Sequence, residues 1–147
     1  MNAPSWLSAI SWSTPMTLEA LRANRAAIPH RSGVYVFTNY STPLVLGTGV
    51  LYVGKATSLN KRVQSYLVDP ATMYVMSQRS GGQRLNSSLR HPGKVLLLVE
   101  IQQKSRGAGL TGIWIRWAQA AAPVIVEQQL IHYFQPAFNT QGRDWDD

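Results

Sequence analysis

The stretches GVYVFT (residues 33–38) and VLYVGK (residues 50–55) decide how this chain of 147 residues folds. Both are rich in β-branched and aromatic residues, which favour extended backbone, and we predict a strand over most of each, at 34–38 and 50–53. The residues between them, 39–49, include one proline and two glycines and predict a loop. Two strands joined in this way predict an antiparallel hairpin.

Helices and further strands are expected on both sides of this hairpin. Gly54 is expected to end the second strand, and Ser58 to cap the helix that follows. Before the hairpin, Thr14 is expected to cap a helix that has Pro15 at its first position. The predicted elements outside the hairpin are an arm or short helix over 1–12, helices over 15–27 and 58–67, strands over 94–102 and 112–119, and a helix over 122–134. This order predicts an α+β domain with a small, mainly antiparallel sheet flanked by helices.

Charge is the most informative bulk property of the chain. It has 14 Lys and Arg against 7 Asp and Glu, for a formal net charge of +7. Three of the seven acids lie in the last four residues, so residues 1–143 carry 14 basic and 4 acidic groups, a balance of 14 − 4 = +10. Ten of the 14 cations are arginines, which suit bidentate contacts with phosphate. Nucleic acid is therefore the expected partner.

The composition also bears on the compartment. Without cysteine the chain has neither disulfides nor thiolate metal sites, which fits an intracellular, cytoplasmic protein. The chain contains no run of about 18 or more apolar residues, so no membrane span is expected. The N-terminus lacks a basic region ahead of an apolar stretch, so no secretory signal is expected.

Glu127 fits poorly with its neighbours on the predicted helix. The residues on its stripe are apolar, namely Val124, Leu130, Ile131 and Phe134. A carboxylate on that stripe faces the core side, where an unpaired charge is so costly that a cation must meet it. Three interpretations are compatible with this position: a structural salt bridge to an arginine, a head group that reaches water from the edge of the stripe, and a metal ligand or catalytic carboxylate.

A lone carboxylate suits Mg²⁺, which accepts one or two protein oxygens and fills its shell with water and substrate phosphate. Zinc is disfavoured because the chain has no cysteine and its three histidines, His30, His91 and His132, lack ligand spacing. His132 is expected at the surface, about 140° around the helix from Glu127.

Five matches identify the chain as resembling the GIY-YIG nuclease family. The hairpin has GVY at 33–35 and YVGK at 52–55. Arg62 lies in NKRVQSY, Glu127 lies in VEQQLIHYFQP, and Asn139 lies in QPAFNT. The likeness is greatest to the nuclease domain of the bacterial nucleotide-excision-repair incision subunit. Valine replaces the isoleucine that gives each tripeptide its name.

The resemblance implies a domain over about residues 29–140. Residues 1–28 would then be an N-terminal arm and helix, and residues 141–147 an acidic tail. Residues 70–121 match no pattern of the family and are interpreted as a specificity insert.

The resemblance also implies roles for individual residues. Glu127 would bind one Mg²⁺ or Mn²⁺, and Arg62 would neutralise the oxygens of the transition state. Tyr35 is the expected general base, with Tyr52 and Lys55 alongside. Asn139 would orient the glutamate or brace the end of its helix. The expected contacts with DNA are Lys55, Lys61, Arg62, Tyr66, Arg79, Arg84, Arg90, Lys94, Lys104 and Arg106.

The function expected from these residues is that of a metal-dependent DNA endonuclease with no small-molecule cofactor. The alternative is a catalytically inactive nucleic-acid-binding module on the same scaffold, and a third is a basic protein that assembles with acidic partners. The matched set is intact, which favours the enzyme. One site cuts one strand, so cleavage of both strands would need a homodimer or two visits.

Overall fold

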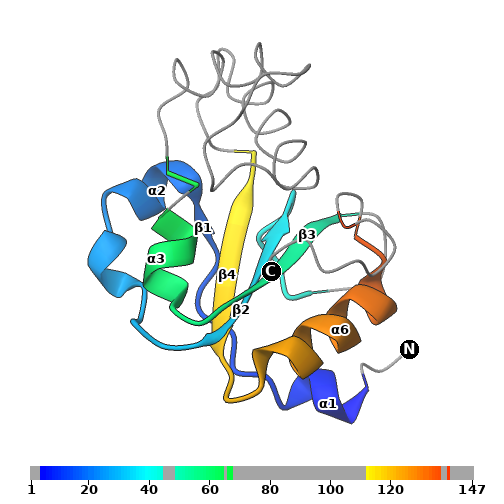
Figure 1. Ribbon diagram of the computed structural model, residues 1–147. Helices are drawn as coiled ribbons and strands as arrows, with labels where there is room; N and C mark the ends of the chain where they lie inside the picture. Colours follow the sequence, from blue (N-terminus) through cyan, green and yellow to red (C-terminus); the bar gives the residue numbers. More distant parts are fainter. Residues whose placement is uncertain (1–3, 45–48, 65, 68–111, 137–138, 140–147) are drawn as a thin grey trace, which may run out of the picture.

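The computed structural model describes residues 4–44, 49–64, 66, 67, 112–136 and 139, and in this part four strands form one sheet (Figure 1). Their order is β1-β4-β2-β3, and every pair is antiparallel. The strands are β1 (Met16–Thr17), β2 (Gly33–Thr38), β3 (Val50–Ala56) and β4 (Trp114–Gln119). The predicted α+β class with a mainly antiparallel sheet is confirmed. The strand predicted over 94–102 lies outside the described residues.

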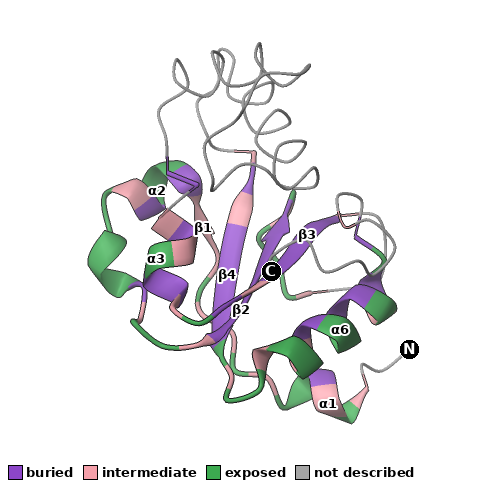
Figure 2. Cartoon of the chain, in the orientation of Figure 1, coloured by how far each residue is buried: buried purple, intermediate pink, exposed green. Residues whose placement is uncertain are grey.

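The helices flank both faces of the sheet. They are α1 (Ser5–Ser8), α2 (Leu18–Arg22), the 3-10 turn η1 (Arg25–Ala27), α3 (Leu59–Gln64) and α6 (Pro123–Phe134). On one face, α2 and α3 pack with Tyr35 and Phe37 of β2 in one apolar cluster. On the other face, α6 and α1 pack with Val34 and Val36 in a second cluster. The central strand β2 is buried along its whole length, as Figure 2 shows.

Gly33 lets β2 pass close to β4 and to helix α3. It is paired with Ala56 of β3 and with Gln119 of β4. A Cβ at this position would overlap the carbonyl oxygen of Ala118 and lie 2.8 Å from Cδ1 of Leu59. The glycine of the GVY motif is therefore a steric requirement of the sheet.

Two predicted boundaries are wrong, the start of the helix before the hairpin and the end of the second hairpin strand. The helix predicted over 15–27 begins at Leu18, where the Thr17 hydroxyl accepts a 3.1 Å bond from the Ala20 amide, so Thr14 is not its cap. Residues 16 and 17 instead form β1 against β4, because pairing along the open edge satisfies their backbone groups. Strand β3 continues past Gly54 to Ala56.

Two helices also differ in detail from their predictions. Helix α3 ends at Gln64 instead of continuing to Leu67. Helix α6 matches the predicted 122–134 closely, but Val124, predicted on its buried stripe, is 44% exposed. The alternation predicted for the fourth strand holds, since Ile113, Ile115 and Trp117 all lie in the cluster under α2 and α3.

Arg116 is a buried cation within β4, with 2% of its surface exposed. Its Nη2 donates to Thr38 Oγ1 and to the Tyr40 carbonyl, both at 3.4 Å, and its Nε has no hydrogen-bond partner in the described part. Burial lowers the pKa of the guanidinium below its ordinary value, and Tyr40 partly opposes this. Because the folded-state pKa is below the unfolded-state value, this cost is present at neutral pH and is relieved only in strong alkali.

We predict that Gly33→Ala lowers the free energy of unfolding by about 1–3 kcal/mol, because the obstructing atom belongs to the backbone of β4 and has little room to move. Urea unfolding followed by circular dichroism would measure the change. An alanine variant as stable as the wild type would contradict the steric requirement.

We predict that Arg116→Met keeps or raises the stability, because an apolar side chain of similar length replaces a poorly partnered charge. Thr38 stays satisfied in this variant through its 2.6 Å bond to the Tyr40 carbonyl. Arg116→Ala is the comparison and should cost about 2–4 kcal/mol through the space it leaves. A methionine variant that melts as low as the alanine variant would show that the charge itself stabilises the fold.

Candidate active site

Three tyrosines gather on the face of the sheet covered by α3. Tyr35 of β2, Tyr52 of β3 and Tyr66 just beyond α3 are each exposed by 1% or less. The hydroxyls of Tyr35 and Tyr66 are 2.9 Å apart, and their ring centroids are 5.7 Å apart. The ring of Tyr52 lies 6.3 Å from that of Tyr35. Two hydroxyls at hydrogen-bond distance can share and transfer a proton.

Gly54 makes room for this cluster. It is directly opposite Tyr35 in the register of β2 and β3. A Cβ on Gly54 would overlap the Cζ and hydroxyl of that ring, so the ring lies flat over the glycine. Sequence reasoning treated Gly54 only as the end of a strand. A glycine opposite an aromatic residue across a hairpin is the signal that would have indicated the contact.

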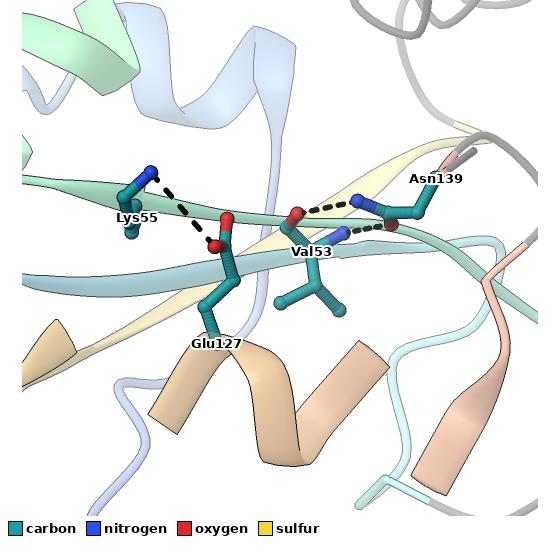
Figure 3. A network of polar contacts seen from close by, with 4 residues as sticks. All are labelled: Val53, Lys55, Glu127 and Asn139. Atoms are coloured by element: carbon teal, nitrogen blue, oxygen red, sulfur yellow. Dashed lines mark hydrogen bonds and ion pairs between the residues drawn. The ribbon is translucent and has the colours of Figure 1, made fainter. Parts of the chain in front are cut away.

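Lys55 and Glu127 meet on the other face of the sheet. Lys55 is paired with Val34, whose side chain belongs to the cluster under α6, and directly opposite residues point to the same face. The Lys55 Nζ lies 3.9 Å from Glu127 Oε1, and the two side chains are 13% and 6% exposed. Figure 3 shows the carboxylate rising from α6 toward the strand that carries the lysine.

The burial of Glu127 excludes one of the three interpretations of its position. The side chain shares the inner face of α6 with Leu130, Ile131 and Phe134, as predicted. Its low exposure excludes a head group that reaches freely into water. A cation does meet it, as its burial requires, and Lys55 is such a cation. His132, on the same helix, is exposed as predicted.

Asn139 fastens the chain beyond α6 to strand β3. The helix ends at Phe134, and its C-cap residue Gln135 has a left-handed φ of 51° and donates its amide to the Ile131 carbonyl at 2.8 Å. Asn139 Oδ1 then accepts from the Val53 amide at 2.8 Å, and its Nδ2 donates to the Val53 carbonyl at 2.9 Å (Figure 3). The side chain thus binds the backbone of β3 two residues before Lys55.

The predicted site residues therefore lie on both faces of the sheet. Tyr52 and Gly54 point toward α3, which also carries Arg62, whereas Val53 and Lys55 point toward α6. Among the described strands, β3 is at the edge of the sheet. Lys61 is exposed and Arg62 is half-buried. The other predicted DNA contacts, Arg79, Arg84, Arg90, Lys94, Lys104 and Arg106, lie outside the described residues.

A hairpin with GVY and YVGK on adjacent strands, beside a helix with one buried glutamate, resembles a GIY-YIG endonuclease domain. No family model matches the chain. Over 125 residues, or 85% of its length, the chain is 34% identical to UvrABC system protein C of Chlorobaculum tepidum, and it spans 15% of the length of that relative. The resemblance predicted from the motifs is thereby confirmed.

Solved structures of the GIY-YIG N-terminal endonuclease domain of UvrC from Thermotoga maritima are also similar. The form bound to magnesium has a TM-score of 0.45 at 23% identity, covering 83% of this chain and 98% of that chain. A point mutant bound to its catalytic divalent cation has a TM-score of 0.47 at 20% identity, covering 84% of this chain and 98% of that chain.

No described helix is long and apolar enough to cross a membrane.

We predict that Asn139→Ala lowers the free energy of unfolding by about 1–3 kcal/mol, because two backbone groups of β3 lose their partner. Asn139→Asp should cost at least as much, since a carboxylate oxygen then faces the Val53 carbonyl. Chemical denaturation of the three proteins would test this order. An aspartate variant more stable than the alanine variant would contradict the assigned orientation of the amide.

Proposed function

We propose that this chain is a divalent-metal-dependent endonuclease that hydrolyses phosphodiester bonds in DNA. The observation that carries the proposal is Glu127, a buried carboxylate on an apolar helix face beside Lys55 of the YVGK motif. The identity to the UvrABC protein over most of this chain supports it. The net charge of +7 supports a polyanionic substrate.

The donor set fits a weakly held Mg²⁺ or Mn²⁺. No group of three or more His, Cys, Asp or Glu that could hold a metal occurs in the described part of the chain, so a cage made only of protein ligands is not indicated there. Mg²⁺ keeps several waters and is commonly held by one or two carboxylates together with substrate phosphate. Glu127 is the residue that would hold it. When bound, the metal would polarise the scissile phosphate and stabilise the departing oxygen.

The basic residues would stabilise the negative charge that builds on the phosphate. Arg62, whose guanidinium stays charged at any working pH, would neutralise the non-bridging oxygens. Lys55 would help to neutralise the phosphate from the face of the sheet that carries Glu127. Its side chain is 13% exposed there and can be reached. Arg62 and Lys55 lie on opposite faces of the sheet, so we place the phosphate over the edge of β3, between them.

Tyr35 is our proposed general base. An ordinary phenol has a pKa near about 10, so a tyrosine becomes a base at neutral pH only where cations favour the phenolate. Arg62 of α3, on the face of the sheet that carries Tyr35, would be such a cation. The Tyr66 hydroxyl, 2.9 Å away, would donate a hydrogen bond to the Tyr35 phenolate and help to stabilise it. Tyr52, on the same face, is the second candidate for this role.

The second candidate function is a nucleic-acid-binding module without catalysis. The ion pair between Lys55 and Glu127 is the observation that favours it, because a carboxylate already neutralised by a lysine needs no metal. Such a module would bind DNA equally well with and without divalent metal.

We predict that wild-type protein nicks supercoiled plasmid in Mg²⁺ but not in EDTA, and that Glu127→Gln lowers the rate about 100-fold or more. The substitution keeps the shape of the side chain and removes its charge. His132→Gln, at an exposed position of the same helix, is the matched control and should cut like the wild type. Melting curves of all three proteins would separate a loss of chemistry from a loss of fold.

Cleavage that persists in EDTA, or a Glu127→Gln variant that cuts at the wild-type rate, would overturn the metal-dependent mechanism. Folded proteins that bind DNA and never cut it would favour the binding module.

A further inference from the structure

The segment before β2 is held firmly along helix α3. The Leu59 amide donates to the Arg31 carbonyl at 2.8 Å, and the Asn60 amide donates to the Pro29 carbonyl at 3.0 Å. The buried Asn60 side chain also donates to the Ile28 carbonyl at 3.0 Å. These bonds join the two segments closely, and α2 and α3 lie side by side in Figure 1.

The same contact positions the side chain of Arg25. Gln64 of α3 donates to Asn60 Oδ1 at 2.6 Å, and the Gln64 Oε1 accepts from Arg25 Nη1 at 3.3 Å. An amide orients the guanidinium without neutralising it, because it carries no charge. Arg25 is therefore held next to the last turn of α3 with its positive charge intact.

Lys61 lies between Arg25 and Arg62 around the helix. Successive residues of an α-helix are rotated by about 100°. Gln64, which holds Arg25, is thus about 60° from Lys61 on one side, and Arg62 is about 100° from it on the other. The buried Leu59 and Val63 define the opposite, inner side of the helix.

These cations lack acidic neighbours among the residues that the structure describes. Arg25, Arg31 and Lys61 are exposed, and within the described part of the chain no carboxylate lies within ion-pair distance of any of them. The only described acids are Glu19, in the first turn of α2, and Glu127, which is paired with Lys55 under the other face of the sheet. A solvated surface usually mixes both signs of charge, so a row of one sign suggests a polyanionic ligand.

We propose that Arg25, Arg31 and Lys61, here called the α3 ridge, bind the sugar-phosphate backbone of the nucleic-acid substrate beside the cleaved bond. The inference rests on the proposed function, because Arg62 of the same helix is the proposed clamp on the reacting phosphate. Helix α3 has six residues and is therefore about 9 Å long. The phosphates of one DNA strand are spaced by about 3.4 Å along the duplex axis, so the helix spans about two to three of them. Contacts of this kind position the substrate without reading its sequence.

The ridge gives the N-terminal segment a function in substrate binding. Arg25 and Arg31 precede the strand of the GVY motif, and packing against α3 brings them beside residues that follow the YVGK motif. The substrate would therefore extend from the edge of β3 across the solvent face of α3.

The test compares two variants of the full chain with equal net charge. Arg25→Gln, Arg31→Gln and Lys61→Gln together remove three positive charges from the ridge. Ser5→Glu, Ser8→Glu and Ser11→Glu together add three negative charges at exposed positions in and after α1, which packs beside α6. Binding of a labelled duplex of about 30 base pairs would be measured in EDTA between roughly 50 and 200 mM NaCl.

Each lost phosphate contact should reduce the slope of log K against log salt by about 0.9, so the ridge variant should lose about 2–3 units of slope and the α1 variant far less. Equal losses in the two variants would show that only net charge matters and would overturn the ridge. Should the triple variant melt early, the single variants Arg31→Gln and Lys61→Gln are each expected to lose about 0.9.

Plasmid cleavage by the same proteins separates this inference from the proposed function. Wild type that binds with the expected ridge dependence but never cuts would refute the nuclease and leave the ridge intact. Wild type that cuts, together with a ridge variant of unchanged slope, would refute the ridge alone. A wild type that neither binds nor cuts nucleic acid would overturn both.

Discussion

The contact between the Tyr35 ring and Gly54 sets the arrangement of the rest of the site. The ring fits only where the facing strand lacks a Cβ, so it holds the hairpin in the register that pairs these two residues. A slip by one residue would turn every side chain of β3 to the other face and would place Val53 or Lys55 beneath the ring. The register therefore decides that Tyr52 joins the tyrosine cluster and that Lys55 faces α6.

Because β3 lies at the edge of the described sheet, residues on both of its faces can contact one ligand under the proposed function. A site within the middle of the sheet would keep its two faces apart, whereas the described sheet ends at β3. Asn139 binds the backbone of this strand from beyond α6, and so fixes the helix that carries Glu127 against the strand that carries Lys55. Tyr66, just past α3, contacts Tyr35 on the opposite face. The same hairpin thus carries Tyr35, Tyr52 and Lys55 and packs against the helices that carry Arg62 and Glu127.

Sequence reasoning succeeded where the signal is local and failed where a distant segment decides. The hairpin and α6 follow from β-branched runs and from helical periodicity, which also placed Glu127 on the inner face of its helix. The Thr14-Pro15 signal gave the wrong start for α2, because Met16 and Thr17 pair with residues almost a hundred positions away. The partner of Asn139, Val53, is also distant, at 86 positions in the sequence. Strand alternation alone, however, already implies that Tyr52 and Lys55 face opposite sides.

The α6 face of the sheet has two described cations, the buried Arg116 and the partly exposed Lys55, and Glu127 is paired with the more exposed of the two. Arg116 and Lys55 are opposite Val36 and Val34, so both point to this face. At about 4 Å an ion pair gains about 4 kcal/mol at an effective dielectric constant near 20, and desolvation of the two ions takes back a similar amount. If the carboxylate served to neutralise a buried charge, Arg116, at 2% exposure, would need it more.

Among the described residues the buried carboxylate lies instead beside the lysine at the sheet edge, whose side chain is 13% exposed. Arg116 donates hydrogen bonds to neutral oxygens of Thr38 and Tyr40. A buried carboxylate beside the more exposed of two cations, and not where burial demands it most, is the pattern expected under the proposed function, in which a ligand at the sheet edge is the reason for its position.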